Sequence, residues 1–136
     1  MRRSSLLMGV AAALAIAALL ALMPMPTRAA AHAEAQCFML QSWTGGWRAS
    51  ADGRSIYLRL NTGQVYQLQL DGSHPMLNYP LAVLHSRTYV DTGICGPLDL
   101  QLTVSDGTGA RDALIVRKML LLTPSQVAAL PKNVRP

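Results

Sequence analysis

The sequence predicts a mainly β protein, a small antiparallel β-sandwich or barrel with a short C-terminal helix and one disulfide. Three observations favour this fold class. Turn residues recur at short, regular intervals, the segments between them alternate apolar and polar side chains, and the chain has only two cysteines. The turn signals are Asp52-Gly53, Asn61-Thr62-Gly63, Asp71-Gly72, Gly93, and Asp106-Gly107 with Gly109.

The clearest strands form a predicted hairpin. Residues 56–60 and residues 65–70 each alternate apolar and polar side chains, and a turn at residues 61–63 joins them. The side chains expected to face the core are Ile56, Leu58, Leu60, Tyr66, Leu68 and Leu70. Further strands are expected at residues 38–40, 81–84, 99–104 and 113–122.

The carboxyl end predicts a short helix over residues 125–130. Thr123 suits the N-cap position, Pro124 suits the first helical position, and Gln126 completes a capping box. Pro131 is expected to end the helix. The remaining residues, 132–136, are expected to form a frayed tail.

The first 35 residues have the three-part pattern of a secretory signal peptide. Arg2 and Arg3 precede an apolar run over residues 6–22, and small-x-small patterns follow as far as Ala35. Cleavage is therefore expected after Ala33 or Ala35. This pattern predicts that the protein is exported.

The alternative for the apolar run is a membrane anchor. The run is at the short end of the roughly 17–25 residues that a membrane span needs, and much of it is alanine, which inserts weakly. We therefore expect a single domain over residues 36–136, periplasmic or secreted. No stable membrane span is expected after cleavage.

The charge of this domain is modestly basic. From Gln36 onward, nine lysines and arginines face six aspartates, which gives a net charge of +3. The cations are scattered singly apart from Arg117-Lys118, so no patch has the density of a nucleic-acid interface. The domain also lacks glutamate, so acid–base chemistry by paired carboxylates would depend on aspartates in turns.

The two cysteines, Cys37 and Cys95, are expected to form the disulfide, because oxidising compartments form and keep such bonds. The bond would close a loop of nearly 60 residues and contribute about 4 kcal/mol. The competing interpretations are two free thiols, or a zinc site shared with His74 and His85. No paired metal-ligand spacing is present in the sequence.

Trp43 and Trp47 are the possible ligand contacts. They flank Thr44-Gly45-Gly46, and two indoles on a Gly-rich loop can stack on a sugar or on an aromatic side chain of a peptide. The sequence favours the other interpretation, that one or both plug an end of the barrel, with the indole N–H satisfied locally.

No catalytic residue, metal ligand or cofactor site is predicted. His74 lies in a predicted loop and His85 at a predicted strand end, and neither has an evident partner in the sequence. Asp91 and Asp99 lie near Cys95, but a bonded cysteine supplies no thiolate for a nucleophile.

Two polar elements have structural explanations. Asp99 is expected to cap backbone N–H groups beside the disulfide. Residues 106–112 match neither an EF-hand nor a Walker sequence, and they are expected to form a hairpin tip.

The domain resembles a known family in four elements. They are Cys37-Phe38, the tyrosine-bearing hairpin around Tyr57 and Tyr66, Ile94-Cys95-Gly96-Pro97-Leu98-Asp99-Leu100, and the ending from Leu122 to Pro131. They are similar to a family of small exported proteobacterial proteins of unknown function, over nearly the whole of residues 37–136. The resemblance implies a periplasmic domain whose two cysteines pair, and it carries over no catalytic residue.

The sequence favours a non-enzymatic binding or structural module of the cell envelope. Its expected partner is an envelope protein, a peptide or a glycan, and no nucleic acid or cofactor is expected. One alternative is an inhibitor of an envelope-directed hydrolase, which would need an exposed probe residue such as Arg87 or His85. The other alternative is a carrier that holds a small ligand in an aromatic pocket.

Overall fold

A computed structural model describes residues 36–44, 46–88 and 93–136. The predicted signal peptide over residues 1–35, its cleavage sites after Ala33 and Ala35, and Asp91 lie outside the described residues. Among the described residues, no helix is long and apolar enough to cross a bilayer.

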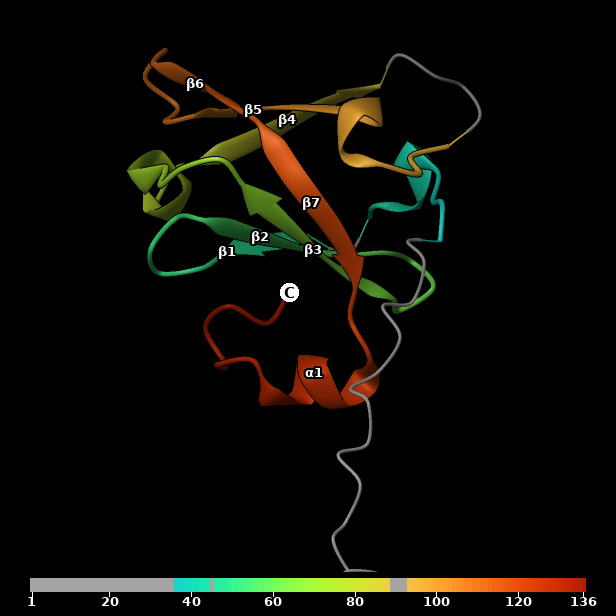
Figure 1. Cartoon of the computed structure of the whole chain (residues 1–136). Helices are drawn as coiled ribbons and strands as arrows, with labels where there is room; N and C mark the ends of the chain where they lie inside the picture. The colour runs from blue at the N-terminus through green and yellow to red at the C-terminus, as the bar shows by residue number, and fades with distance from the viewer. Residues whose placement is uncertain (1–35, 45, 89–92) are drawn as a thin grey trace, which may run out of the picture. The chain divides into compact units, whose positions relative to one another are not determined.

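The described strands form two antiparallel sheets (Figure 1). The first sheet has the order β1-β2-β3-β7 and the second has the order β4-β5-β6. The predicted fold class is confirmed, with two separate sheets rather than one closed barrel. The strands are β1 (Trp47–Ala49), β2 (Ser55–Arg59), β3 (Val65–Leu70), β4 (Val83–Thr88), β5 (Leu100–Ser105), β6 (Arg111–Leu114) and β7 (Val116–Leu121).

The hairpin of β2 and β3 pairs as its alternation predicts, with Ile56 opposite Leu68 and Leu58 opposite Tyr66. These four side chains are fully buried. They join residues of the second sheet, including Leu102 and Val104, in one apolar cluster between the sheets. The core therefore lies between the two sheets, as the sequence pattern indicates.

The prediction of one strand over residues 113–122 is wrong. The segment is divided at Ile115, with β6 pairing with β5 and β7 pairing with β3. Figure 1 shows the chain passing from the second sheet into the first at this point. A strand can change sheets at such a bend, and the apolar pattern on both sides hides the bend from sequence reasoning.

Two other predicted strands differ from the structure. In residues 38–40, only Phe38 makes a bridge, to Ile94, and the chain then turns into the 3-10 helix η2 (Leu40–Ser42). The strand predicted at residues 81–84 begins at Val83. Residues 79–82 instead follow the 3-10 helix η3 (Pro75–Asn78), where Ala82 N–H bonds the carbonyl of Tyr79.

The C-terminal helix α1 (Pro124–Ala129) is confirmed together with its capping box. Gln126 N–H donates to the Thr123 hydroxyl at 3.3 Å, and Thr123 N–H donates to the side-chain carbonyl of Gln126 at 2.8 Å. Pro124 occupies the first turn, where its missing N–H costs nothing.

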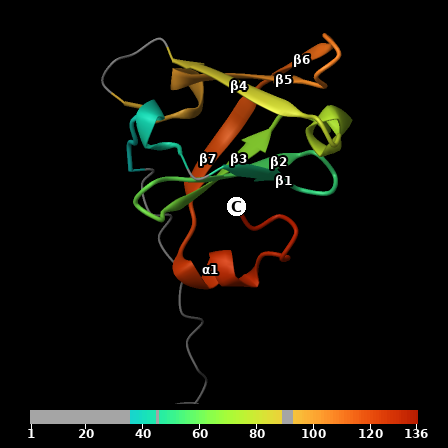
Figure 2. The same ribbon diagram turned by 180° about the vertical axis from the view of Figure 1, so that it is seen from behind.

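The prediction of a frayed tail after the helix is wrong. Val134 is buried in a second apolar cluster with Tyr57 and Val65, on the outer face of the first sheet. Arg59 Nε donates to the carbonyl of Pro136 at 2.8 Å, and the Arg135 guanidinium donates to two carbonyls at the end of α1. Figures 1 and 2 agree that α1 and the tail lie on the side of the first sheet opposite the second sheet.

Candidate functional site

The two cysteines form the predicted disulfide. Cys37 and Cys95 are joined with an S–S distance of 1.99 Å, so the free-thiol and zinc interpretations of these residues are wrong. The predicted capping by Asp99 is confirmed, because its Oδ2 accepts the backbone N–H groups of Cys95 at 2.9 Å and Gly96 at 2.8 Å. These residues hold the fold together, and Cys95 has no thiolate to act as a nucleophile.

The two tryptophans take different roles. Trp43 Nε1 donates to the carbonyl of Gly46 at 3.1 Å, and its ring packs against the core. This is the structural role, with a locally satisfied indole N–H, that the sequence favours. Trp47 begins β1 and also packs against the core, but it borders an open cleft. The two indoles therefore do not form one platform, and of the two only Trp47 lines this cleft.

The cleft has a volume of about 680 Å³ and runs beside β1. One wall is formed by residues 46–49 and Ala51, the other by residues 77–80 and Ala82, and Asn133 of the C-terminal segment contributes at the border. Asn78 Nδ2 donates to the carbonyls of Ser50 and Ala51, which fixes η3 against the turn after β1. The two walls are thus held in place by the chain itself.

The strand wall of the cleft is a sheet edge. Residues 46–49 are consecutive and all line the cleft, although successive side chains of a strand point to opposite faces. Only the edge of a strand presents all of them to one space. β1 is the outermost strand of the first sheet, so this edge has no paired strand in the described part of the chain.

The electrostatics of the cleft come from one cation. Arg48 is exposed and lines the cleft, and none of the lining residues is acidic. Its Nη1 donates to the carbonyl of Trp47 at 2.9 Å. The neighbouring Asp52 is held within its own turn by the hydroxyl of Ser50 and the N–H of Arg54, and these hydrogen bonds lower the pKa of the Asp52 carboxyl.

The opposite wall includes an exposed aromatic residue. Tyr79 lines the cleft with about half of its surface exposed. Leu81 and Val83 are also exposed, at 69% and 48%, but they flank Ala82, which lines the cleft, and do not line it themselves. Signals for this wall are weak in the sequence, because residues 77–82 only show a break at Pro80 before a short strand.

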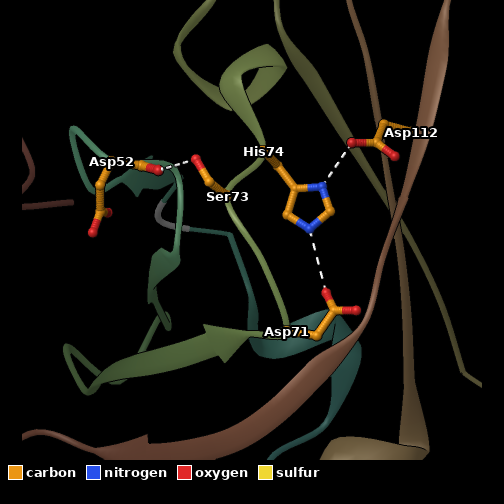
Figure 3. Close-up of polar contacts among 5 residues, drawn as sticks. All are labelled: Asp52, Asp71, Ser73, His74 and Asp112. Atoms are coloured by element: carbon orange, nitrogen blue, oxygen red, sulfur yellow. Dashed lines mark hydrogen bonds and ion pairs between the residues drawn. The ribbon is translucent and has the colours of Figure 1, made fainter.

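His74 makes a polar cluster that the sequence did not indicate (Figure 3). Its Nδ1 lies 2.6 Å from Asp112 Oδ2 and its Nε2 lies 3.4 Å from Asp71 Oδ1. The His74 side chain is 13% exposed. His74 lies in the predicted loop, directly before η3, and its partner Asp112 of β6 approaches it only through the fold.

The contacts of His74 join separate segments of the chain. Asp71 directly follows β3 and Asp112 lies in β6, so the imidazole lies between two carboxylates. Ser73 points away from the ring and donates to the carbonyl of Asp52 at 2.5 Å (Figure 3), so no Ser-His pair forms.

The remaining polar candidates are also accounted for. His85 lies within β4 rather than at a strand end, and its Nε2 lies 3.0 Å from the hydroxyl of Ser105. Arg87 and His85 are both exposed on this strand. The predicted hairpin tip is confirmed, with Asp106 accepting from Thr108 between β5 and β6. Within the described residues, no group of three or more His, Cys, Asp or Glu side chains is placed to hold a metal ion.

Comparisons with known proteins add no functional information: no protein-family model, no curated protein and no solved structure matches this chain. The resemblance to small exported proteobacterial proteins stays a prediction. The cleft beside β1 is the candidate site on its geometry alone.

Proposed function

We propose that the chain is an exported, non-enzymatic binding module of the cell envelope, and that it binds its partner in the cleft beside β1. The observation that supports this proposal is the cleft of about 680 Å³ bordered by Trp47, Arg48 and Tyr79, in which Tyr79 keeps about half of its surface exposed. Open grooves with aromatic walls and a single charge suit recognition of a partner surface. The His74 cluster, in contrast, has its polar atoms paired within the chain.

The binding test compares two exposed apolar residues. Tyr79 lines the cleft, whereas Leu98, which is 91% exposed, lies on the 3-10 helix η4 (Pro97–Asp99) and does not. The domain over residues 36–136 would be immobilised and exposed to envelope extract, as wild type, Tyr79→Ala and Leu98→Ala. We expect a partner that wild type and Leu98→Ala retain and that Tyr79→Ala loses. Retention by Tyr79→Ala with loss by Leu98→Ala would move the binding site away from the cleft.

The non-enzymatic part has its own test. Wild type, His74→Ala and His85→Ala would be compared for turnover on a panel of hydrolase substrates and for bound metal. We expect neither turnover nor stoichiometric metal in any of the three. A turnover or a bound metal ion that is lost in either variant would contradict the non-enzymatic proposal and support an enzyme.

Export is tested by the mass of the mature chain. After expression in a secreting host, we expect the isolated protein to begin within about two residues of Glu34 or Gln36, where the small-x-small patterns converge. A chain that retains Met1 would contradict export by cleavage.

A further inference from the structure

We propose that the partner is an extended, acidic peptide segment that adds as a strand to the open edge of β1, with a carboxylate of the segment paired to Arg48. The inference rests on the proposed function, because it places the partner in the same cleft. It adds the chemical class of the partner and the way in which its backbone is bound.

The first support is the direction of the β1 backbone groups. The Gly46 carbonyl accepts Arg59 N–H at 3.3 Å, and Ser50 N–H donates to the Ser55 carbonyl at 2.8 Å, so both ends of β1 bond to β2. Along an antiparallel pair, alternate residues exchange these bonds. Arg48 therefore belongs to the bonded set, and the amide groups of Trp47 and Ala49 point away from β2, toward the open edge.

The second support is the position of the Arg48 guanidinium. Its Nη1 bonds the carbonyl of Trp47, one of the edge groups that an added strand would use. An incoming backbone N–H would donate to this carbonyl and displace the Arg48 guanidinium from it. The displaced guanidinium would then be free to pair with a carboxylate of the incoming segment, a strong charge-assisted contact.

The third support is the charge of the surroundings. Arg48 is the single charged residue among those that line the cleft, and the domain carries a net charge of +3. Asp52, the nearest acid along the chain, is bonded to Ser50 and Arg54 inside its own turn. A segment that carries Asp or Glu is therefore attracted, and a basic segment is repelled.

The two walls together favour a peptide over a glycan. A sugar can stack on an aromatic face and bond single amides, but it lacks the regular spacing of backbone groups that matches a strand edge. An added strand uses both features, since its backbone pairs with β1 while alternate side chains contact the wall of Leu77, Tyr79 and Pro80. An acidic oligosaccharide is the competing occupant that the experiment must exclude.

The test measures affinity by fluorescence anisotropy, with a labelled (Thr-Glu)4 peptide as the probe. Two matched peptides are used: (Thr-Lys)4, which reverses the charge, and (Thr-Glu)4 N-methylated at successive residues, which removes the backbone donors on both edges. The protein variants are Arg48→Glu and, as a control, Arg117→Glu. Arg117 is also exposed, and it lies in β7, the other edge strand of the same sheet. Its substitution changes the net charge by the same amount but does not touch the β1 edge.

We expect binding of (Thr-Glu)4 to wild type and to Arg117→Glu within about twofold of each other. We expect a loss of about tenfold or more for Arg48→Glu, for (Thr-Lys)4 and for the N-methylated peptide. Equal binding of the N-methylated peptide, or equal losses in the two protein variants, would overturn strand addition at this edge. Binding of a galacturonic acid oligomer without binding of the peptide would assign the cleft to a glycan. In that case, retention of partner by Leu98→Ala and its loss in Tyr79→Ala would still support the proposed function.

Discussion

The two sheets differ in what covers their outer faces. In β2 of the first sheet, three successive residues, Ile56, Tyr57 and Leu58, are buried, so both faces are covered. In β4 of the second sheet, exposed and half-buried residues alternate along the whole strand. The difference arises because the C-terminal segment packs on the outer face of the first sheet through Val134. Because both faces of the first sheet are covered, the part that stays accessible at β1 is the edge of this strand. The cleft lies along that edge.

The largest expected effect is on the free energy of unfolding, when the disulfide that joins the segments before the two sheets is removed. Cys37 precedes β1 and Cys95 precedes β5, 58 residues apart. We expect the double variant Cys37→Ala, Cys95→Ala to lose about 2–5 kcal/mol of unfolding free energy in urea titrations. Wild type treated with reductant should show a similar loss. A double variant as stable as the oxidised wild type would mean that the disulfide contributes nothing to the fold.

The cover of the first sheet is tested at Val134. Val134→Asp places a charge in the buried cluster with Tyr57 and Val65, and we expect it to lose at least about 1.5–3 kcal/mol, the value of burying the valine side chain. Asn133→Asp is the matched control, because Asn133 is exposed and adjacent to Val134, and the substitution changes the net charge by the same amount. Similar midpoints of urea unfolding for the two variants would mean that Val134 is not buried and that the tail is frayed, as the sequence predicts.

The burial of tyrosine is expected to make stability fall at high pH. Burial raises the pKa of Tyr66, whose hydroxyl donates to the carbonyl of Gln36 at 2.6 Å. The unfolded chain therefore loses this proton first, so the contribution is complete below about pH 10 and is lost as the pH rises through the folded-state pKa. We expect Tyr66→Phe to cost about 1 kcal/mol at neutral pH.

The matching measurement is urea unfolding at neutral pH and again above pH 10. The gap between wild type and Tyr66→Phe should narrow as the pH rises, since phenylalanine has no proton to lose. A gap that widens with pH would contradict the raised pKa of Tyr66. Tyr57, whose pKa is raised by burial and then by the charge of Asp52, should respond in the same direction.

The smallest effect is expected for the polar link between the sheets. His74 follows β3 of the first sheet and contacts Asp112 of β6 in the second. Asp112 is 43% exposed, so solvent screening limits the pair to a coupling of about 0.5–1 kcal/mol. A double-mutant cycle with His74→Ala and Asp112→Ala measures that coupling. Additive single effects would show that the contact does not connect the sheets energetically.

Sequence patterns predicted the elements that depend on neighbouring residues. The alternation of β2 and β3 gave the side chains that face the core, and the Thr123 capping box located α1. Patterns missed what depends on distant segments. The alternation leaves Tyr57 on the face opposite the core, and it does not indicate that this face is covered, because the covering residues Leu122 and Val134 lie more than 60 residues later.

The candidate site was predicted only in part, for the same reason. Trp47 was only a possible ligand contact, and β1 is three residues long, too short to show alternation. Arg48, Tyr79 and Asn133 come from three distant segments and carry no shared local motif. Their common property, a border on one cleft, exists only after the chain has folded.

The most direct measurement is amide hydrogen exchange at β1 with and without saturating (Thr-Glu)4 peptide. The N–H groups of Trp47 and Ala49 point away from β2, so an added strand should slow their exchange, whereas Arg48 N–H, within the bonded set, should change little. Protection of Trp47 and Ala49 that disappears in Arg48→Glu is the predicted result. Unchanged exchange at both amides under saturating peptide would contradict strand addition at the β1 edge.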